Sequence, residues 1–189
     1  MGIRSFLAFE LPPDMKDVVC RVSDELKRSS LRVRWVKPEN IHLTVVFLGS
    51  IAPEELPSIL ESTGSVCRCQ GPFKLMIRGM GRFGNRRHPR VLWLGLDGDV
   101  KEMGAFRDEL QDTLEPFGVQ REKRAFNPHL TLGRFSKGAR SSEELDGLMA
   151  VYESLTSPVC TLDKLALFRS DLRPDGAVYT QLAEWPLEG

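Results

Sequence analysis

The chain of 189 residues can form one compact domain or two small lobes, and its content of 41% hydrophobic and 28% charged residues is typical of a globular protein. Its 26 Lys and Arg residues balance 26 Asp and Glu residues, so no overall charge draws it to a polyanion or a membrane surface. The first residues lack the apolar run of a signal peptide, and no segment approaches the ~20 apolar residues of a membrane span. We therefore expect a cytoplasmic protein with no membrane partner.

The first half of the chain predicts the order strand, helix, strand, strand, helix, strand. Helices are indicated where apolar residues recur at helical spacing, and strands where they alternate or run continuously. Two prolines end the first strand, and Pro53 with two following acids opens the second helix. The expected segments are a strand at 5–11, a helix at 14–28, a short extended segment at 33–36, a strand at 41–49, a helix at 53–66 and a strand at 73–80.

The second half repeats this order with considerable drift. The expected segments are a strand at 90–96, a helix at 100–114, an extended segment at 119–123, a strand at 129–135, a helix from 142 to about 155, a strand at 159–168 and a final strand at 177–184. A capping-box pattern, Ser141 to Glu144, opens the last helix. We expect an α+β fold with two pseudo-symmetric lobes in a single domain spanning 1–189, with repeat halves at roughly 1–85 and 86–175 and a cleft between the lobes.

The tripeptide His-Leu-Thr occurs once in each half, at His42 and again 87 residues later at His129. The chain has only three histidines, so two of them occupy the same place in the repeat. On a strand, residues i and i+2 point to the same face, which places each histidine beside Thr44 or Thr131. If the two sheets open toward a shared cleft, the two pairs face each other and can exchange protons with one small anion.

A structural explanation competes with this interpretation, because a duplicated scaffold also repeats its packing residues. We favour the functional explanation, since polar residues within apolar strands carry a desolvation cost that packing alone does not offset. A metal site is not indicated: no group of carboxylates accompanies the histidine strands, and the lone Cys67-Arg68-Cys69 has no second ligand pair at zinc spacing. The four cysteines are expected to be free thiols, mostly buried.

Charge is unevenly distributed despite the neutral total. The segment from Ser62 to Leu96 holds no acid, and a second basic block surrounds His129 with Glu122 as its lone acid. Such runs are usually solvated faces, but both lie in or beside loops near the histidine strands, which favours a basic rim for the phosphates of a polyanion. His88 lies in the loop 84–89. It could touch a substrate there, but we expect a solvent-exposed side chain. The basic residues are Arg68, Lys74, Arg78, Arg82, Arg86, Arg87 and Arg90 in the first block, and Arg121, Lys123, Arg124, Arg134, Lys137 and Arg140 in the second.

The pair of His-Leu-Thr strands resembles the 2H phosphoesterase superfamily, and its RNA 2′,3′-cyclic phosphodiesterases (also called 2′-5′ RNA ligases) are the most similar branch. The resemblance covers nearly the whole chain. It is carried by Arg34-Trp35-Val36, by Asn40 to Gly49, by Pro89 to Gly95 and by Pro128 to Arg134. It implies a two-lobed α+β fold with an antiparallel sheet in each lobe. It also implies cleavage of a terminal 2′,3′-cyclic phosphate to a 2′-phosphate without metal or cofactor, and 2′-5′ joining when an RNA 5′-hydroxyl is the acceptor.

The resemblance also assigns roles to single residues. His42 is the general acid toward the leaving oxygen, and His129 is the general base toward water. The assignment of the two histidines as the catalytic pair is firmer than the assignment of acid and base between them. Thr44 and Thr131 hold the non-bridging oxygens, which fits the hydrogen-bonding capacity of their hydroxyls. Arg134 and Phe47, each five positions after a histidine, contact the phosphate and base of the substrate. Strict alternation points both away from the histidine face, so a bulge or strand end must intervene.

Two other functions remain open at this point. The first is a 2H phosphodiesterase for a small nucleotide, such as a 2′-5′ oligoadenylate or a cyclic phosphate on ADP-ribose. The second is a non-catalytic RNA-binding module, since such modules also use β-α-β-β-α-β units but need no paired histidines. For the main hypothesis we expect a monomer acting on RNA 3′ ends, tRNA halves among them, in RNA processing.

Overall fold

The computed structural model describes residues 2–174 and 176–189. These residues form nine strands in two antiparallel sheets and four α-helices. The expected α+β fold with two lobes, each built on an antiparallel sheet, is confirmed. The strands are β1 (Ile3–Phe9), β2 (Val33–Trp35), β3 (Leu43–Ile51), β4 (Phe73–Gly84), β5 (Pro89–Gly98), β6 (His129–Phe135), β7 (Cys160–Leu162), β8 (Lys164–Arg173) and β9 (Gly176–Pro186). The helices are α1 (Pro13–Leu26), α2 (Leu56–Arg68), α3 (Val100–Leu114) and α4 (Glu143–Val151).

The two halves of the sequence exchange strands between the sheets. The first sheet, which we call sheet A, has the order β3-β1-β8-β9, and the second, sheet B, has the order β2-β6-β5-β4-β7. In sheet A, the histidine strand β3 lies beside β1, the first strand of the first half, and β1 also pairs with β8 from the end of the second half. Sheet B repeats this arrangement: the histidine strand β6 lies beside β5, the first strand of the second half, and β5 also pairs with β4 from the end of the first half. The division into sequence halves therefore does not coincide with the division into lobes.

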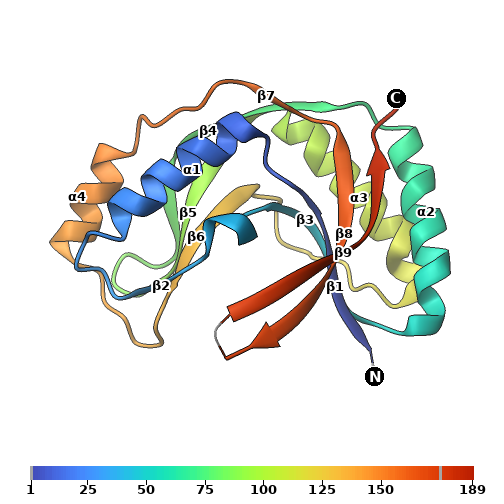
Figure 1. The fold of residues 1–189 in the computed structure, drawn as a ribbon, viewed down its shortest axis with the longest axis horizontal. Coiled ribbons are helices and arrows are strands. Elements are labelled where there is room, and N and C mark those ends of the chain that lie inside the picture. Colours follow the sequence, from blue (N-terminus) through green and yellow to red (C-terminus); the bar gives the residue numbers. More distant parts are fainter. Residues whose placement is uncertain (1, 175) are drawn as a thin grey trace.

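The helices lie on the outer sides of the two sheets. Helices α2 and α3 cover sheet A, and α1 and α4 lie together on the side of sheet B (Figure 1). One face of each sheet packs against these helices to form the main core, which includes Leu7 and Leu43 in sheet A and Leu94 and Leu130 in sheet B. The opposite faces, which we call the inner faces, carry no helix and are turned toward the middle of the molecule (Figure 1).

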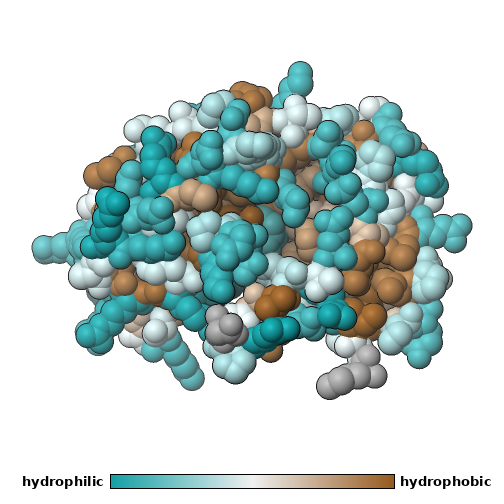
Figure 2. All heavy atoms as spheres, viewed as in Figure 1, coloured by the Kyte–Doolittle hydropathy of each residue, from teal (hydrophilic) through white to brown (hydrophobic). Residues whose placement is uncertain are grey.

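Polar and apolar surface is also divided between the lobes. Hydrophilic side chains cover most of the side of α1 and α4, whereas apolar side chains gather between the β8–β9 strands and α2 (Figure 2). None of the helices formed by residues 2–174 and 176–189 is long and apolar enough to cross a membrane.

Most expected elements are confirmed, with the helix at 100–114 and the strand at 129–135 matching to the residue. The extended segment expected at 119–123 lies outside both sheets, in an irregular connection in which Val119 is buried. Two expectations were wrong in detail. The helix from Ser142 ends at Val151, and the strand expected at 159–168 is two strands, because the chain passes at Asp163 from the edge of sheet B to sheet A. The capping box expected from Ser141 to Glu144 does not form. The helix is capped one residue later, by the Ser142 hydroxyl, which accepts a hydrogen bond from the Leu145 amide, and the Glu144 carboxylate accepts one from the Ser30 amide.

Candidate active site

The first histidine lies one residue before β3, at the inner face of sheet A. Its Nδ1 is 2.8 Å from the carbonyl oxygen of Asn40. A carbonyl only accepts hydrogen bonds, so Nδ1 carries the proton and Nε2 is left free to exchange one. The ring stacks on Phe6 at 4.7 Å between centroids and meets the edge of Tyr179 at 5.2 Å. His42 is half-buried in this aromatic setting, so one side of it remains open to a ligand.

The second histidine begins β6 in sheet B and repeats the arrangement. Nδ1 of His129 is 2.7 Å from the carbonyl oxygen of Asn127, which again leaves Nε2 free. The edge of Phe83 meets the ring at 4.7 Å, and Trp93 lies at 6.2 Å between centroids. His129 is also half-buried. The expected exposure of both imidazoles to an anion is therefore compatible with the structure.

A β-bulge three residues after each histidine changes the alternation of the strand. In sheet A, Thr44 pairs with Ala8 and Phe47 with Phe6, because Val45 is inserted without a partner. In sheet B, Thr131 pairs with Trp93 and Arg134 with Val91, because Leu132 is inserted in the same way. Directly paired residues share a face, so each bulge returns the fifth residue after the histidine to the inner face.

The structure therefore places the six residues expected from the sequence three on each inner face: His42, Thr44 and Phe47 in sheet A, and His129, Thr131 and Arg134 in sheet B. Phe47 is 67% exposed and its ring lies 6.3 Å from that of Phe6, on which His42 stacks. Arg134 is exposed beside Thr131 and within electrostatic range of His129. Thr44 and Thr131 are half-buried on the same faces as their histidines.

Burial lowers the pKa of both histidines. For His42 the hydrogen bond to the Asn40 carbonyl opposes this effect and tends to raise the pKa. For His129 the bond to the Asn127 carbonyl opposes it in the same way, but the guanidinium of Arg134 lowers the pKa further. Both imidazoles are therefore biased to the neutral state until an anion between them favours a proton.

The two inner faces lie close to each other. Burial raises the pKa of Tyr179 in sheet A, and the charges of Arg134 in sheet B and of Arg4 partly oppose this rise. Tyr179 in turn touches His42, and strands β3 and β6 contact each other. The β8–β9 hairpin that carries Tyr179 reaches toward sheet B (Figure 1) and is fastened by a 3.1 Å hydrogen bond from the Asn40 side chain to the Ala177 carbonyl.

Several residues at this site were not expected from the sequence. The rings of Phe6 and Tyr179 contact His42, and the ring of Phe83 contacts His129. Arg4 and Arg34 add exposed cations. Arg34 pairs directly with Arg134 across β2 and β6, so it shares the inner face. An asparagine precedes each histidine by two residues, and this repeat could have been recognised in the sequence. The aromatic and arginine contacts depend on strand pairing and could not be predicted from the sequence.

Among residues 2–174 and 176–189 no group of three or more His, Cys, Asp and Glu side chains could hold a metal ion. All four cysteines are free, with Cys67 and Cys160 buried, Cys20 half-buried and Cys69 exposed. A concavity of about 600 Å³ lies apart from both histidines, between the β4–β5 turn and the start of α4.

Comparison with known proteins agrees with the resemblance seen in the sequence. The model of the 2′-5′ RNA ligase superfamily matches residues 13–174. An RNA 2′,3′-cyclic phosphodiesterase of Methanothermobacter thermautotrophicus is 36% identical over 185 residues, which is 96% of this chain and 97% of that protein. The enzyme of the same name from Archaeoglobus fulgidus is 31% identical, with 95% of this chain and 98% of that protein covered.

The solved structures give the same fold. TT0787 of Thermus thermophilus superimposes with a TM-score of 0.82 at 26% identity, covering 99% of each chain. E. coli LigT in complex with 3′-AMP has a TM-score of 0.78 at 22% identity and covers 100% of each chain, which shows the fold alone. With a family model matching most of its length and full-length relatives above 30% identity, the chain belongs to the 2′-5′ RNA ligase superfamily of 2H phosphoesterases.

Proposed function

We propose that this protein hydrolyses the 2′,3′-cyclic phosphate at the 3′ end of RNA. The observation that carries the proposal is the repeated histidine geometry: each imidazole has Nδ1 fixed by a backbone carbonyl and Nε2 free, on the inner faces of two sheets whose histidine strands β3 and β6 contact each other. The names of the full-length relatives support the substrate class. E. coli LigT, which shares the fold, binds 3′-AMP and phosphate in crystals.

The reaction needs one proton removed and one supplied on opposite sides of phosphorus. Nε2 of His129 accepts a proton from water as the water oxygen bonds to phosphorus. Nε2 of His42, protonated in the bound state, gives its proton to the ribose oxygen as its bond to phosphorus breaks. Each transfer contributes about 10²- to 10⁴-fold in rate. The negative phosphate between the rings offsets the burial that lowers both pKa values, so one imidazole can hold the proton.

The remaining residues hold the phosphate and base. The hydroxyls of Thr44 and Thr131 donate to the non-bridging oxygens and keep phosphorus in line between the imidazoles. Arg134 donates to the same group with a full charge, and charge-assisted hydrogen bonds are stronger than neutral ones. Phe47, exposed at the end of the aromatic group around His42, offers a face on which a base can stack.

The family resemblance adds finer expectations. The ring opens to a 2′-phosphate, and an RNA 5′-hydroxyl in place of water gives a 2′-5′ linkage. The protein acts as a cytoplasmic monomer, without metal or cofactor, on substrates that include tRNA halves. Separating 2′- from 3′-phosphate products by chromatography tests the first point. Comparing turnover of RNA with that of small cyclic nucleotides distinguishes RNA processing from the small-nucleotide alternative.

The central test measures hydrolysis of a dinucleotide with a 2′,3′-cyclic end by the His42→Ala and His129→Ala variants, with His88→Ala as the control. The first two variants should lose at least about 10²-fold in kcat, the control should keep its rate, and EDTA should have no effect. Full activity in either of the first two variants would refute the site. RNA binding without turnover that survives loss of both histidines would instead support the non-catalytic module.

A further inference from the structure

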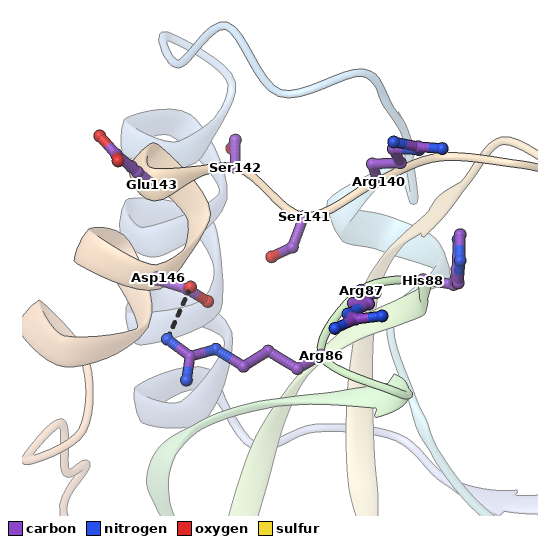
Figure 3. A pocket seen from close by; sticks show the side chains of 8 residues that line it. All are labelled: Arg86, Arg87, His88, Arg140, Ser141, Ser142, Glu143 and Asp146. Atoms are coloured by element: carbon purple, nitrogen blue, oxygen red, sulfur yellow. Dashed lines mark hydrogen bonds and ion pairs between the residues drawn. The ribbon is translucent and has the colours of Figure 1, made fainter.

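A basic concavity lies at the end of sheet B, apart from the histidine site. The β4–β5 turn supplies one wall with Arg86, Arg87 and His88, and the loop from β6 to α4 supplies the other with Arg140 (Figure 3). The β5 strand begins at Pro89, six residues before Gly95, the partner of His129. At ~3.3 Å per residue, the concavity is therefore about 20 Å from the catalytic imidazole.

Two arginines at this concavity have no acidic partner in the described part of the chain: Arg87 and Arg140. Arg86 reaches across to Asp146 (Figure 3), but this N···O distance is 3.3 Å and the Arg86 side chain is 80% exposed, so the pair is weak. Asp146 is held more closely, at 2.7 Å, by the guanidinium of the half-buried Arg82. Arg86 can therefore turn to another anion while Asp146 stays compensated.

The walls of the concavity are fixed to each other. The Ser141 amide donates to the Arg87 carbonyl at 3.1 Å, and Arg82 donates to the Ser141 hydroxyl at 3.2 Å. Within the turn, the Asn85 side chain accepts from the amides of Arg87 and His88. The first turn of α4 adds the positive end of its dipole, although Glu143 at the rim offsets part of it. The cations are thus mounted on ordered backbone and can bind an anion with little reorganisation.

A second pair of arginines lies between the histidine site and the concavity. Arg34 and Arg134 are directly paired across β2 and β6, and both are exposed on the inner face. Like charges in direct cross-strand pairs repel each other, and an anion above them removes that repulsion. Arg134 also pairs with Val91, which is four residues from Arg87 along the chain, so the arginines of the inner face and those of the concavity form a row at the same end of sheet B.

We propose that this row of arginines binds the backbone phosphates of the single RNA strand that precedes the cyclic end, with the concavity as a remote phosphate subsite. The proposal rests on the proposed function and adds to it a substrate of defined minimum length. At ~3.4 Å per stacked nucleotide, 20 Å corresponds to about six nucleotides, and to fewer in an extended strand. Dinucleotides reach neither Arg87 nor Arg140, whereas a twelve-nucleotide strand reaches both.

The test measures kcat and KM on cyclic-ended RNAs of two, four, eight and twelve nucleotides. For the Arg87→Ala/Arg140→Ala double variant, KM for the twelve-mer should rise about 5- to 20-fold with kcat unchanged, and the dinucleotide should be unaffected. The slope of log KM against log salt should fall by about 0.7 for each phosphate that the variant no longer neutralises. Arg34→Ala should raise KM already at four nucleotides.

The matched control is Arg68→Ala. Arg68 belongs to the first basic block of the sequence, but the structure places it exposed on α2, which covers sheet A, so it lies outside the concavity beside α4 and outside both inner faces. This variant should leave KM unchanged at every length. A KM that does not depend on length in the unaltered protein, or a twelve-mer KM equal in the double variant and the control, would overturn the proposal even with the histidine chemistry intact.

Failure of the proposed function would look different. Cyclic-phosphate hydrolysis would then be absent at all lengths, and the subsite would be judged by binding of a fluorescent twelve-mer with a 3′-phosphate. Binding weakened in the double variant but not in Arg68→Ala would support the subsite alone. Equal binding by both would reject it. A salt slope in the unaltered protein that is the same for two and twelve nucleotides also rejects it, whatever the stability of the variants.

Discussion

The two histidine sites share a backbone but differ in their surroundings. Both have the imidazole before a β-bulge, with Nδ1 fixed by a carbonyl two residues earlier. After the bulge, sheet A presents the aromatic Phe47 and sheet B the cationic Arg134. The duplicated scaffold therefore keeps the proton-exchanging group constant and varies the fifth residue, so one side can receive a base and the other a phosphate.

The difference also bears on the roles of the histidines. Burial lowers the pKa of both, but only His129 has its pKa lowered further by a nearby guanidinium. This favours neutral His129 as the base, in agreement with the assignment by family resemblance. His42, enclosed by the rings of Phe6 and Tyr179, is the one left to take the proton when the phosphate binds.

The largest effect should come from removing each histidine in turn, and two substrates with different leaving groups should distinguish the acid from the base. On a cyclic phosphate, His42→Ala and His129→Ala should each lose about 10²- to 10⁴-fold in kcat. On a nucleoside p-nitrophenyl phosphodiester, whose leaving group needs no proton, His42→Ala should recover most of its rate and His129→Ala should not. Initial rates on the two substrates check this, and recovery by His129→Ala instead would reverse the roles.

Removing Arg134 should have the next largest effect. Hydrogen bonds to charged groups are worth about 1.5–3 kcal/mol, so Arg134→Ala should reduce kcat/KM about 10- to 150-fold. Because the Arg134 charge lowers the pKa of His129, its loss should raise that pKa, and the acidic limb of the pH–rate profile should move to higher pH. Arg134→Lys, which keeps the charge, is the control for the pH shift. If the acidic limb of the pH–rate profile does not move in Arg134→Ala, the Arg134 charge does not act on the pKa of His129.

Phe47→Ala should have a smaller effect, confined to binding. Stacking of one base on an aromatic ring is worth about 1–3 kcal/mol, so KM should rise about 5- to 150-fold with little change in kcat. Because the side chain is 67% exposed, its loss should change the free energy of unfolding by less than about 0.5 kcal/mol. Steady-state kinetics and urea denaturation measure both, with the 60%-exposed Val159→Ala as the control. A fall in kcat with unchanged KM would contradict a stacking role.

The smallest effect concerns stability. Both histidines have a lowered pKa in the folded state. As the pH falls below the pKa of an unfolded histidine, about 6.5, the unfolded state therefore binds more protons than the folded state. Their contribution to stability is present above about pH 6.5 and is lost as pH falls toward the folded-state pKa. Urea midpoints at pH 7.5 and 5.5 should differ less for His42→Gln/His129→Gln than for the unaltered chain. An equal difference would show that neither histidine is desolvated enough to matter.

Local patterns in the sequence were sufficient for most elements. The helix at 100–114 and the strand at 129–135 follow from apolar spacing within a few turns or residues, and the His-Leu-Thr repeat identified the proton-exchanging pair. Strict alternation failed at Phe47 and Arg134, because a bulge depends on the pairing partner in another strand rather than on the strand itself. Phe6 and Tyr179 gave no signal, and Arg34 belonged to a family motif without an expected role at the site, since the place of all three comes from contacts distant in sequence.

The sequence by itself therefore determined which residues can exchange protons and on which strands they lie, because periodicity and repeat are local properties of the chain. Only the tertiary structure decided that β4 and β8 change sheets, that both bulges turn the fifth residue after the histidine inward, and that the histidine strands β3 and β6 of the two sheets contact each other. These outcomes follow from which strands gain most by pairing and burying apolar surface together, and such long-range choices are not written in any single segment.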